Sequence, residues 1–125
     1  MRIYPWAATQ ALIDDLAGTG LTITTDAAQA TATILTGRPA AVVSAPRVDA
    51  DDHAAARYTW RVAVIGAPVR DEDAAGTALD QALTAITSTP DLETSDAEPV
   101  TWSGTQTTSA PAYLLTLTRR YPTHA

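Results

Sequence analysis

The alternation of apolar and polar residues is most regular between Arg57 and Ala67, and it predicts a strand rich in β-branched and aromatic side chains. Its two faces are Tyr58, Trp60, Val62 and Val64 on one side and Thr59, Arg61, Ala63 and Ile65 on the other. From Ala75 to Ile86 the apolar spacing becomes helical, and Pro90 ends this stretch. A strand followed at once by an amphipathic helix indicates a helical layer packed on a sheet.

Shorter patterns fill the rest of the chain. Residues 1–17 predict a helix that has Pro5 in its first turn and is closed by Gly18 or Gly20. The other segments are interpreted as strands at Leu21–Thr25, Ala32–Thr36, Ala40–Ala45, Val100–Trp102 and Ala112–Tyr121, one helical turn at Ala27–Ala30, a polar linker at Asp91–Glu98 and a turn at Ser103–Ser109.

The stretch from Pro46 to Ala56 has no apolar period and is strongly charged. It is interpreted either as an exposed loop or as a projecting hairpin tip between two strands. With short connections elsewhere, we expect one α+β domain over residues 1–125. It would have a single-layer, mainly antiparallel sheet of about four to five strands, with two helices packed on one face.

Composition narrows the classes of protein that fit. The 125 residues, 46% of them apolar, suffice for one core, and the absence of cysteine excludes disulfides and thiolate zinc sites. The formal charge is −6 and lysine is absent, which argues against general attraction to nucleic acid or anionic membranes. Because no apolar run approaches about 20 residues, and residues 1–17 lack the pattern of a secretion signal, we expect a cytoplasmic protein or a particle assembled in a cytoplasm.

Motifs with known chemistry are missing from the sequence. A phosphate-binding P-loop needs a lysine, and neither Gly-x-Gly-x-x-Gly nor Gly-x-Ser-x-Gly occurs. With two histidines in the chain, a histidine-based centre has a single plausible member, His53. We therefore expect no enzymatic activity, no catalytic residues and no cofactor.

Two acidic clusters have alternative interpretations. Asp49, Asp51, Asp52 and His53 offer ligands for a hard cation, but the central glycine and distal glutamate of a calcium loop are absent, so a solvated loop is favoured and no metal site is predicted. The run from Asp71 to Asp73 resembles paired carboxylates for acid–base work, yet capping of the following helix is the favoured interpretation.

Aromatic and arginine residues also have two interpretations each. Tyr58, Trp60, Trp102 and Tyr113 either line a ligand pocket or form the core, and the core is favoured. The pair Arg119–Arg120 is too short for a nucleic-acid patch. It is interpreted as an edge-strand charge pair that discourages aggregation.

A family pattern joins these elements. It consists of a helix ending Leu-x-Gly-x-Gly-Leu, a short strand followed by Thr-Asp, the segment Tyr58-Thr-Trp-Arg-Val-Ala-Val-Ile65, the helix Ala78-Leu-Asp-Gln-Ala-Leu83, and Glu98-Pro-Val-Thr-Trp102 leading to Pro111-Ala-Tyr-Leu-Leu-Thr-Leu117. Over roughly residues 6–120 the chain resembles the tail terminator, or tail-completion, proteins of long-tailed phages that infect actinobacteria. Other small connector proteins of the phage neck have a similar pattern.

The resemblance implies a small α+β virion subunit that forms a ring, expected to be a hexamer, at the head-proximal end of the tail. Such a ring caps the tail tube, ends its polymerisation and presents a surface to the head–tail connector protein. Its partners would be further copies of itself, the tail tube protein and the connector, with no membrane. By position, the loops that contact the ring and the tube would contain Arg47, Asp49, Asp51, Asp52, His53, Arg57, Thr105, Gln106 and Thr107.

The acidic composition agrees with a channel for DNA. Six copies at −6 each give a ring of formal charge −36. If part of that charge lines the lumen, DNA passes through without specific binding. The alternatives are another head–tail connector or neck protein, a generic self-associating adaptor, or a small ligand-binding α+β domain that uses the aromatic sheet face and Asp49–His53.

Overall fold

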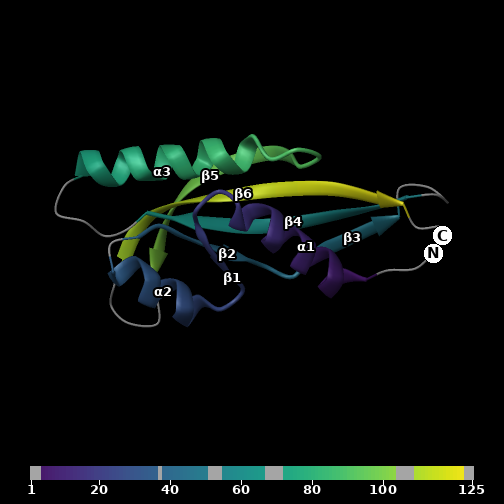
Figure 1. Ribbon diagram of the computed structural model, residues 1–125, viewed down its shortest axis with the longest axis horizontal. Helices are drawn as coiled ribbons and strands as arrows, with labels where there is room; N and C mark the ends of the chain where they lie inside the picture. The colour runs from purple at the N-terminus through teal and green to yellow at the C-terminus, as the bar shows by residue number, and fades with distance from the viewer. Residues whose placement is uncertain (1–3, 37, 51–54, 67–71, 104–108, 123–125) are drawn as a thin grey trace.

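The computed structural model describes residues 4–36, 38–50, 55–66, 72–103 and 109–122. Within these ranges the chain forms three helices and a sheet of six strands (Figure 1). In chain order they are α1 (Pro5–Ala17), β1 (Thr22–Thr24), α2 (Ala27–Leu35), β2 (Ala40–Val43), β3 (Arg47–Ala50), β4 (Ala55–Ile65), α3 (Glu72–Thr87), β5 (Glu93–Ser103) and β6 (Ser109–Pro122).

The sheet has the strand order β1-β2-β4-β6-β5, with β3 paired to β4 outside this path. β1 and β2 run parallel because α2 forms the crossover between them, and every other pairing is antiparallel. β2 pairs with the second half of β4 and β3 with its first half, so the two short strands follow one another along the same edge of β4.

Ser44 bridges the break between β2 and β3. Its Oγ accepts a hydrogen bond from the Arg61 N–H at 3.0 Å, and its own N–H donates to the Arg61 carbonyl at 3.1 Å. The backbone groups of Arg61 are therefore satisfied although neither strand reaches them. As a result, β2, Ser44 and β3 together hydrogen-bond to most of one edge of β4.

The helices lie on both faces of the sheet. In Figure 1, α3 lies above the strands and α2 below them, while α1 crosses β4. The larger core joins α1 and α3 to one sheet face through Leu12, Leu16, Leu79, Ile86, Trp60, Val62, Leu115 and Leu117. A smaller core on the opposite face joins α2 to the end of β4 through Ala30, Ile34, Ala40, Ile65, Ala110 and Ala112. The expected α+β sheet is present, and its two predicted helices, α1 and α3, share one face.

Trp60 is the centre of the larger core. Its side chain is fully buried, and the indole Nε1–H donates to Thr9 Oγ1 of α1 at 3.0 Å. Tyr58 is buried beside it with its ring stacked at 5.9 Å, which confirms the core interpretation for these two residues. Tyr113 is partly buried against the same core and Trp102 against the smaller one, so the four aromatic residues do not form one face.

The strand predicted at Ala32–Thr36 is wrong, because α2 continues to Leu35. Asp26 begins the helix by accepting a hydrogen bond from the Ala28 N–H at 2.9 Å. Thr31 and Thr33 return their hydroxyls to the carbonyls four residues earlier, each at 3.0 Å. These β-branched residues favour a strand locally, but the cap and the burial of Ile34 stabilise a helix. Because this segment is helical, the chain has a third helix, and β1 and β2 run parallel on either side of it.

Two further boundaries differ from expectation. Asp91–Glu98 is not a linker, because β5 begins at Glu93, and Arg47–Ala50 is a strand rather than a loop. Residues 95–101 are exposed on both sides of β5, so an edge strand here needs no apolar alternation. β3 and β4 form the hairpin that was the second interpretation of Pro46–Ala56, and its positions 51–54 lie outside the described residues.

The ends of the predicted helices are confirmed where they are described. Pro5 occupies the first turn of α1, and Gly20 has a φ of 82°, a backbone conformation that favours glycine after a helix. α3 ends at Thr87, before Pro90. The helix-capping interpretation of the run from Asp71 to Asp73 remains a prediction, because Asp71 and the side chains of the next two residues lie outside the described part.

Candidate functional site

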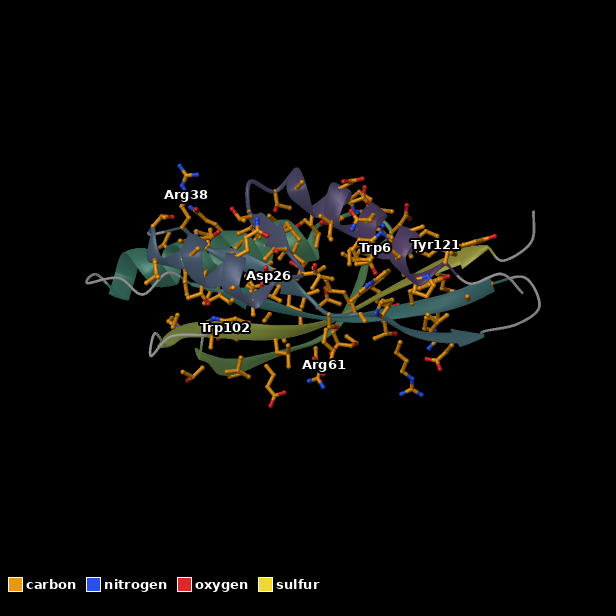
Figure 2. All side chains as sticks on the ribbon, turned by 90° about the horizontal axis from the view of Figure 1, so that it is seen from below. Trp6, Asp26, Arg38, Arg61, Trp102 and Tyr121 are labelled. Atoms are coloured by element: carbon orange, nitrogen blue, oxygen red, sulfur yellow. The ribbon has the colours of Figure 1, made fainter. Side chains whose placement is uncertain are left out.

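Helix α2 covers only one end of the outer sheet face, and the other half carries exposed arginines. We call this surface the arginine face and define it by Arg47 of β3, Arg57 and Arg61 of β4 and Arg120 of β6, all exposed. The pairing of β4 with β6 places Arg57 directly opposite Arg120. The next pair on this face, Thr59 and Thr118, lies between that pair and Arg61. Figure 2 shows Arg61 on the side of the sheet opposite to α1.

Three of the nine predicted contact residues come together at this surface. Asp49 pairs with Arg57 across the hairpin, and Arg47 Nε lies 3.4 Å from Asp49 Oδ2. The Arg47 side chain is 81% exposed, so this ion pair adds little to stability. The other six, Asp51, Asp52, His53, Thr105, Gln106 and Thr107, lie outside the described residues.

Arg61 and Arg120 belong to the same surface but are missing from the predicted contact residues. The signal for Arg61 is the period of two along β4, which places it on the same side as Arg57. No comparable signal exists for Arg120, because only the pairing of β4 with β6 brings it opposite Arg57.

A broad open groove of about 1470 Å³ begins at the arginine face. Arg57, Thr118 and Arg120 contribute to one side, and Pro90 and Asp91 of the α3–β5 connection contribute to the other. The groove exists because β5 begins opposite Thr118, so the last residues of β6 have no described strand on the side away from β4. It is a wide surface depression rather than an enclosed reaction site.

Arg119 closes the inner side of this groove. Its side chain is buried, and Nη1 donates to Asp15 Oδ2 of α1 at 2.7 Å and to the Tyr121 hydroxyl at 3.3 Å. Nε and Nη2 donate to the carbonyls of Asp91 and Pro90 at 3.3 and 3.5 Å. Burial lowers the pKa of the Arg119 guanidinium, but the hydrogen bonds to Tyr121 and Asp15 more than offset it, so the net pKa is raised.

The interpretation of Arg119–Arg120 as an edge-strand charge pair fails for Arg119, which is buried. β6 lies between β4 and β5, but β5 begins opposite Thr118, so these two residues lie past its pairing with β5. Only Arg120 is exposed, whereas Arg119 holds α1 to the connection before β5.

The β5 edge of the sheet carries the opposite charge. We call it the acidic edge and define it by Glu93, Asp96 and Glu98 of β5, which are exposed and lie on the same sheet face as the arginines. Asp96 accepts a hydrogen bond from Thr116 Oγ1 at 3.1 Å, and a register shift separates it from Thr94. Pro99 follows, so this long edge combines charge, a bulge and a proline, all of which oppose strand addition.

An apolar patch lies at the start of α1, where Tyr4 is 58% and Trp6 67% exposed (Figure 2). A hollow of about 280 Å³ beside Trp6 is lined by apolar and small residues that include Pro46. Because Pro46 immediately precedes β3, the patch continues toward the hairpin that carries Arg47 and Asp49. Large exposed aromatic residues of this kind mark contact surfaces more often than catalytic pockets.

The described ranges contain no group of three or more histidine and acidic residues arranged to hold a metal ion. Asp51, Asp52 and His53 are not among them, so the sequence interpretation of that cluster stays a prediction. None of the helices in the described part is both long and apolar enough to cross a membrane. Comparison with protein-family models, curated proteins and solved structures finds no match to the chain.

Proposed function

We propose that the chain is a structural subunit of a long-tailed phage, forming a ring that caps the tail tube, ends its polymerisation and joins the tail to the head connector. The sequence resemblance suggests this role. The observation that carries it is the distribution of uncovered surface: the interior is filled by Trp60 and its neighbours, while the arginine face, the acidic edge and the Trp6 patch are exposed. Such a molecule acts through contacts with other subunits.

The burial of the aromatic residues and the hydrogen bonds in the groove favour assembly over ligand binding. Tyr58 and Trp60, which a ligand-binding domain would present to its ligand, are closed off by α1 and α3. The large groove is open and charged, and its most buried polar group, Arg119, already makes four hydrogen bonds. The other neck proteins remain the second candidate because they too act through subunit contacts.

We assign the tube contact to the Trp6 patch and the adjoining β3–β4 hairpin. Tryptophan is enriched at the positions that dominate interface energetics, and Trp6 adds almost nothing to the core because two thirds of it is exposed. The hairpin supplies the polar rim through Arg47 and Asp49. In the assembled ring, DNA passes through the lumen without specific binding.

The test uses a tail tube protein from the genome that encodes this chain. Tube protein polymerised alone should give filaments of variable length, and added subunit should shorten them and appear as a ring at one end in electron micrographs. A subunit that leaves tube length unchanged and instead captures a connector ring would favour the neck-protein alternative. A subunit that binds neither component would refute the proposal.

A further inference from the structure

We infer that an extended segment of the tail tube protein adds a strand to the sheet along the outer edge of β3, next to Tyr4 and Trp6. We call this position the β3 slot and define it as the edge of Arg47–Ala50 that faces away from β4. The inference rests on the proposed function, and it adds how the Trp6 patch and the hairpin bind the tube.

No described strand occupies the β3 slot. β2 and β3 follow one another along one edge of β4, and β1 lies on the far side of β2 (Figure 1). β1 ends at Thr24, opposite Val42, so the line of β1 stops before it reaches β3. The slot continues that line for the four residues of β3, which is about 13 Å along a strand.

The backbone of β3 directs a donor and an acceptor into the slot. The Ser44 N–H donates to the Arg61 carbonyl, so Arg61 directs its backbone groups toward β2 and β3. Because β4 has no bulge along β6, the backbone of Arg57 points the same way, toward its partner Asp49. Backbone direction alternates along a strand, so the N–H and C=O of Val48 point away from β4 and meet no described strand.

Two exposed aromatic side chains lie beside the slot on the core side of the sheet. The Tyr4 N–H donates to the Tyr58 hydroxyl at 3.2 Å, and Tyr58 is directly opposite Val48. The hollow beside Trp6 includes Pro46, which immediately precedes β3. Val48 packs against the larger core on this side. Apolar side chains of an added strand would therefore lie next to Val48 and cover the two aromatic rings.

The other side of β3 carries Arg47 and Asp49, which form an ion pair at 3.4 Å. Because these two charges are matched within the subunit, an added strand needs no charge of either sign beside them. The segment that fits the slot is therefore extended and uncharged, with an apolar residue at every second position and polar residues between them.

The size of the patch argues against a second copy of this chain as the occupant. Tyr4 and Trp6, 58% and 67% exposed, offer together about 300 Å². A stable contact between two folded proteins buries about 800 Å² on each partner. The acidic edge, with its bulge and Pro99, is poorly suited to supply the strand.

A short extended segment needs less area, because backbone hydrogen bonds contribute affinity and alternate side chains contribute specificity. Pairing with β3 also accounts for the end of polymerisation. A tube segment taken up by β3 is no longer open to the next tube subunit.

Val48→Pro in the full chain tests the inference. Proline removes the N–H that points into the slot and leaves the backbone groups that Arg47 and Asp49 direct toward β4, so β3 stays paired. The matched control, Val48→Ala, keeps the N–H and shortens the side chain more than proline does. Circular dichroism verifies folding, and the probe is the same tail tube protein, with capping measured from tube lengths in electron micrographs.

Val48→Ala should cap tubes within about threefold of the wild-type concentration, whereas Val48→Pro should need at least about tenfold more, because one hydrogen bond is lost and the facing carbonyl stays unpaired. Hydrogen–deuterium exchange of the wild type gives a second measurement. The Val48 amide should exchange at least about tenfold more slowly on capped tubes, and amides at the β5 edge should not change. One segment of the tube protein should gain protection at the same time.

Equal losses of capping in the two variants would assign the contact to side-chain packing and overturn strand addition. Normal capping by folded Val48→Pro, or an unchanged Val48 amide on capped tubes, would also overturn it and leave the proposed function intact. Protection of that amide in the subunit alone, rising with concentration, would make a second copy the occupant and overturn the choice of the tube.

If Val48→Pro does not fold, the exchange measurement on the wild type decides alone. A wild type that leaves tube length unchanged would overturn the proposed function, and the inference falls with it.

Discussion

Arg119 Nη1 and Asp15 Oδ2 lie 2.7 Å apart, so a buried guanidinium on β6 is paired with a half-exposed carboxylate on α1. The same guanidinium donates to the carbonyls of Pro90 and Asp91. One side chain therefore joins three segments that are distant in the sequence. Asp91 has a φ of 59°, and its carbonyl is held by this contact in a backbone conformation unusual for a residue other than glycine.

Replacing Arg119 by leucine should lower the free energy of unfolding by about 1–3 kcal/mol, because two backbone carbonyls lose their donor and Asp15 loses its partner. Urea unfolding measures the loss. Arg120→Leu is the control, since Arg120 is exposed and its removal should cost no more than about 0.5 kcal/mol. Equal losses in the two variants would contradict the clamp.

The pH dependence of this effect follows from the raised pKa of Arg119. A raised pKa contributes stability at every pH below the unfolded-state value and loses it only as the pH rises past that value, in strong alkali. The difference in unfolding free energy between wild type and Arg119→Leu should therefore be constant from about pH 6 to about pH 9. A steady decline over that interval would mean that another titrating group controls the contact.

Thr9→Val tests the hydrogen bond at the centre of the core. Valine has the shape of threonine but leaves the Trp60 indole N–H without an acceptor, at a cost of about 1–3 kcal/mol. Thr9→Ser keeps the hydroxyl and removes one methyl group, so it should cost only about 0.8 kcal/mol. The order of the two midpoints in chemical denaturation decides the matter, and serine costing more than valine would show that packing outweighs the hydrogen bond.

Pro99→Val should increase aggregation without unfolding the chain. The pairing of β5 with β6 continues on both sides of Pro99, so its nitrogen faces the free edge, and valine would add a donor there. Thr101→Val also adds apolar surface to β5 two residues along, but it adds no N–H. Light scattering at matched concentration should rise for the first variant only, and a similar rise in both would assign the effect to hydrophobicity.

Trp6→Ala should separate folding from assembly. Because Trp6 is 67% exposed, its loss should change the free energy of unfolding by less than about 1 kcal/mol, yet it should reduce capping of tube ends strongly. Trp6→Phe keeps an apolar ring and should retain most of the capping. Normal capping by the alanine variant would remove Trp6 from the tube contact.

The sequence predicted the parts of the fold that bury a face. Trp60 and the apolar residues at every second position around it predict β4, because only one side of that strand meets the larger core. α3 was predicted for the same reason, since Leu79, Ala82 and Ile86 are buried at helical spacing. The spacing of apolar residues therefore predicts an element well only where one side of that element is buried and the other is exposed.

The errors occur where that contrast is absent. β5 has exposed residues on both sides through its middle, so its composition resembles that of a linker. The threonines of α2 favour a strand by propensity, whereas their hydroxyls bond to the helix backbone and Ile34 packs on the second sheet face. The arginine face could be recognised only from the registers of β3, β4 and β6, and no local sequence pattern contains these registers.

The position of β6 has a consequence for how the molecule is made. β6 is synthesised after every other described strand, yet it lies between β4 and β5 and pairs with all of β4. Until residues 109–122 leave the ribosome, β5 has no described neighbour to pair with, and one edge of β4 stays bare. Nascent chains must therefore wait in a partly folded, aggregation-prone form, and a chain that stops before residue 109 lacks a complete sheet. The synthesis of β6 thereby limits which copies can complete their sheet.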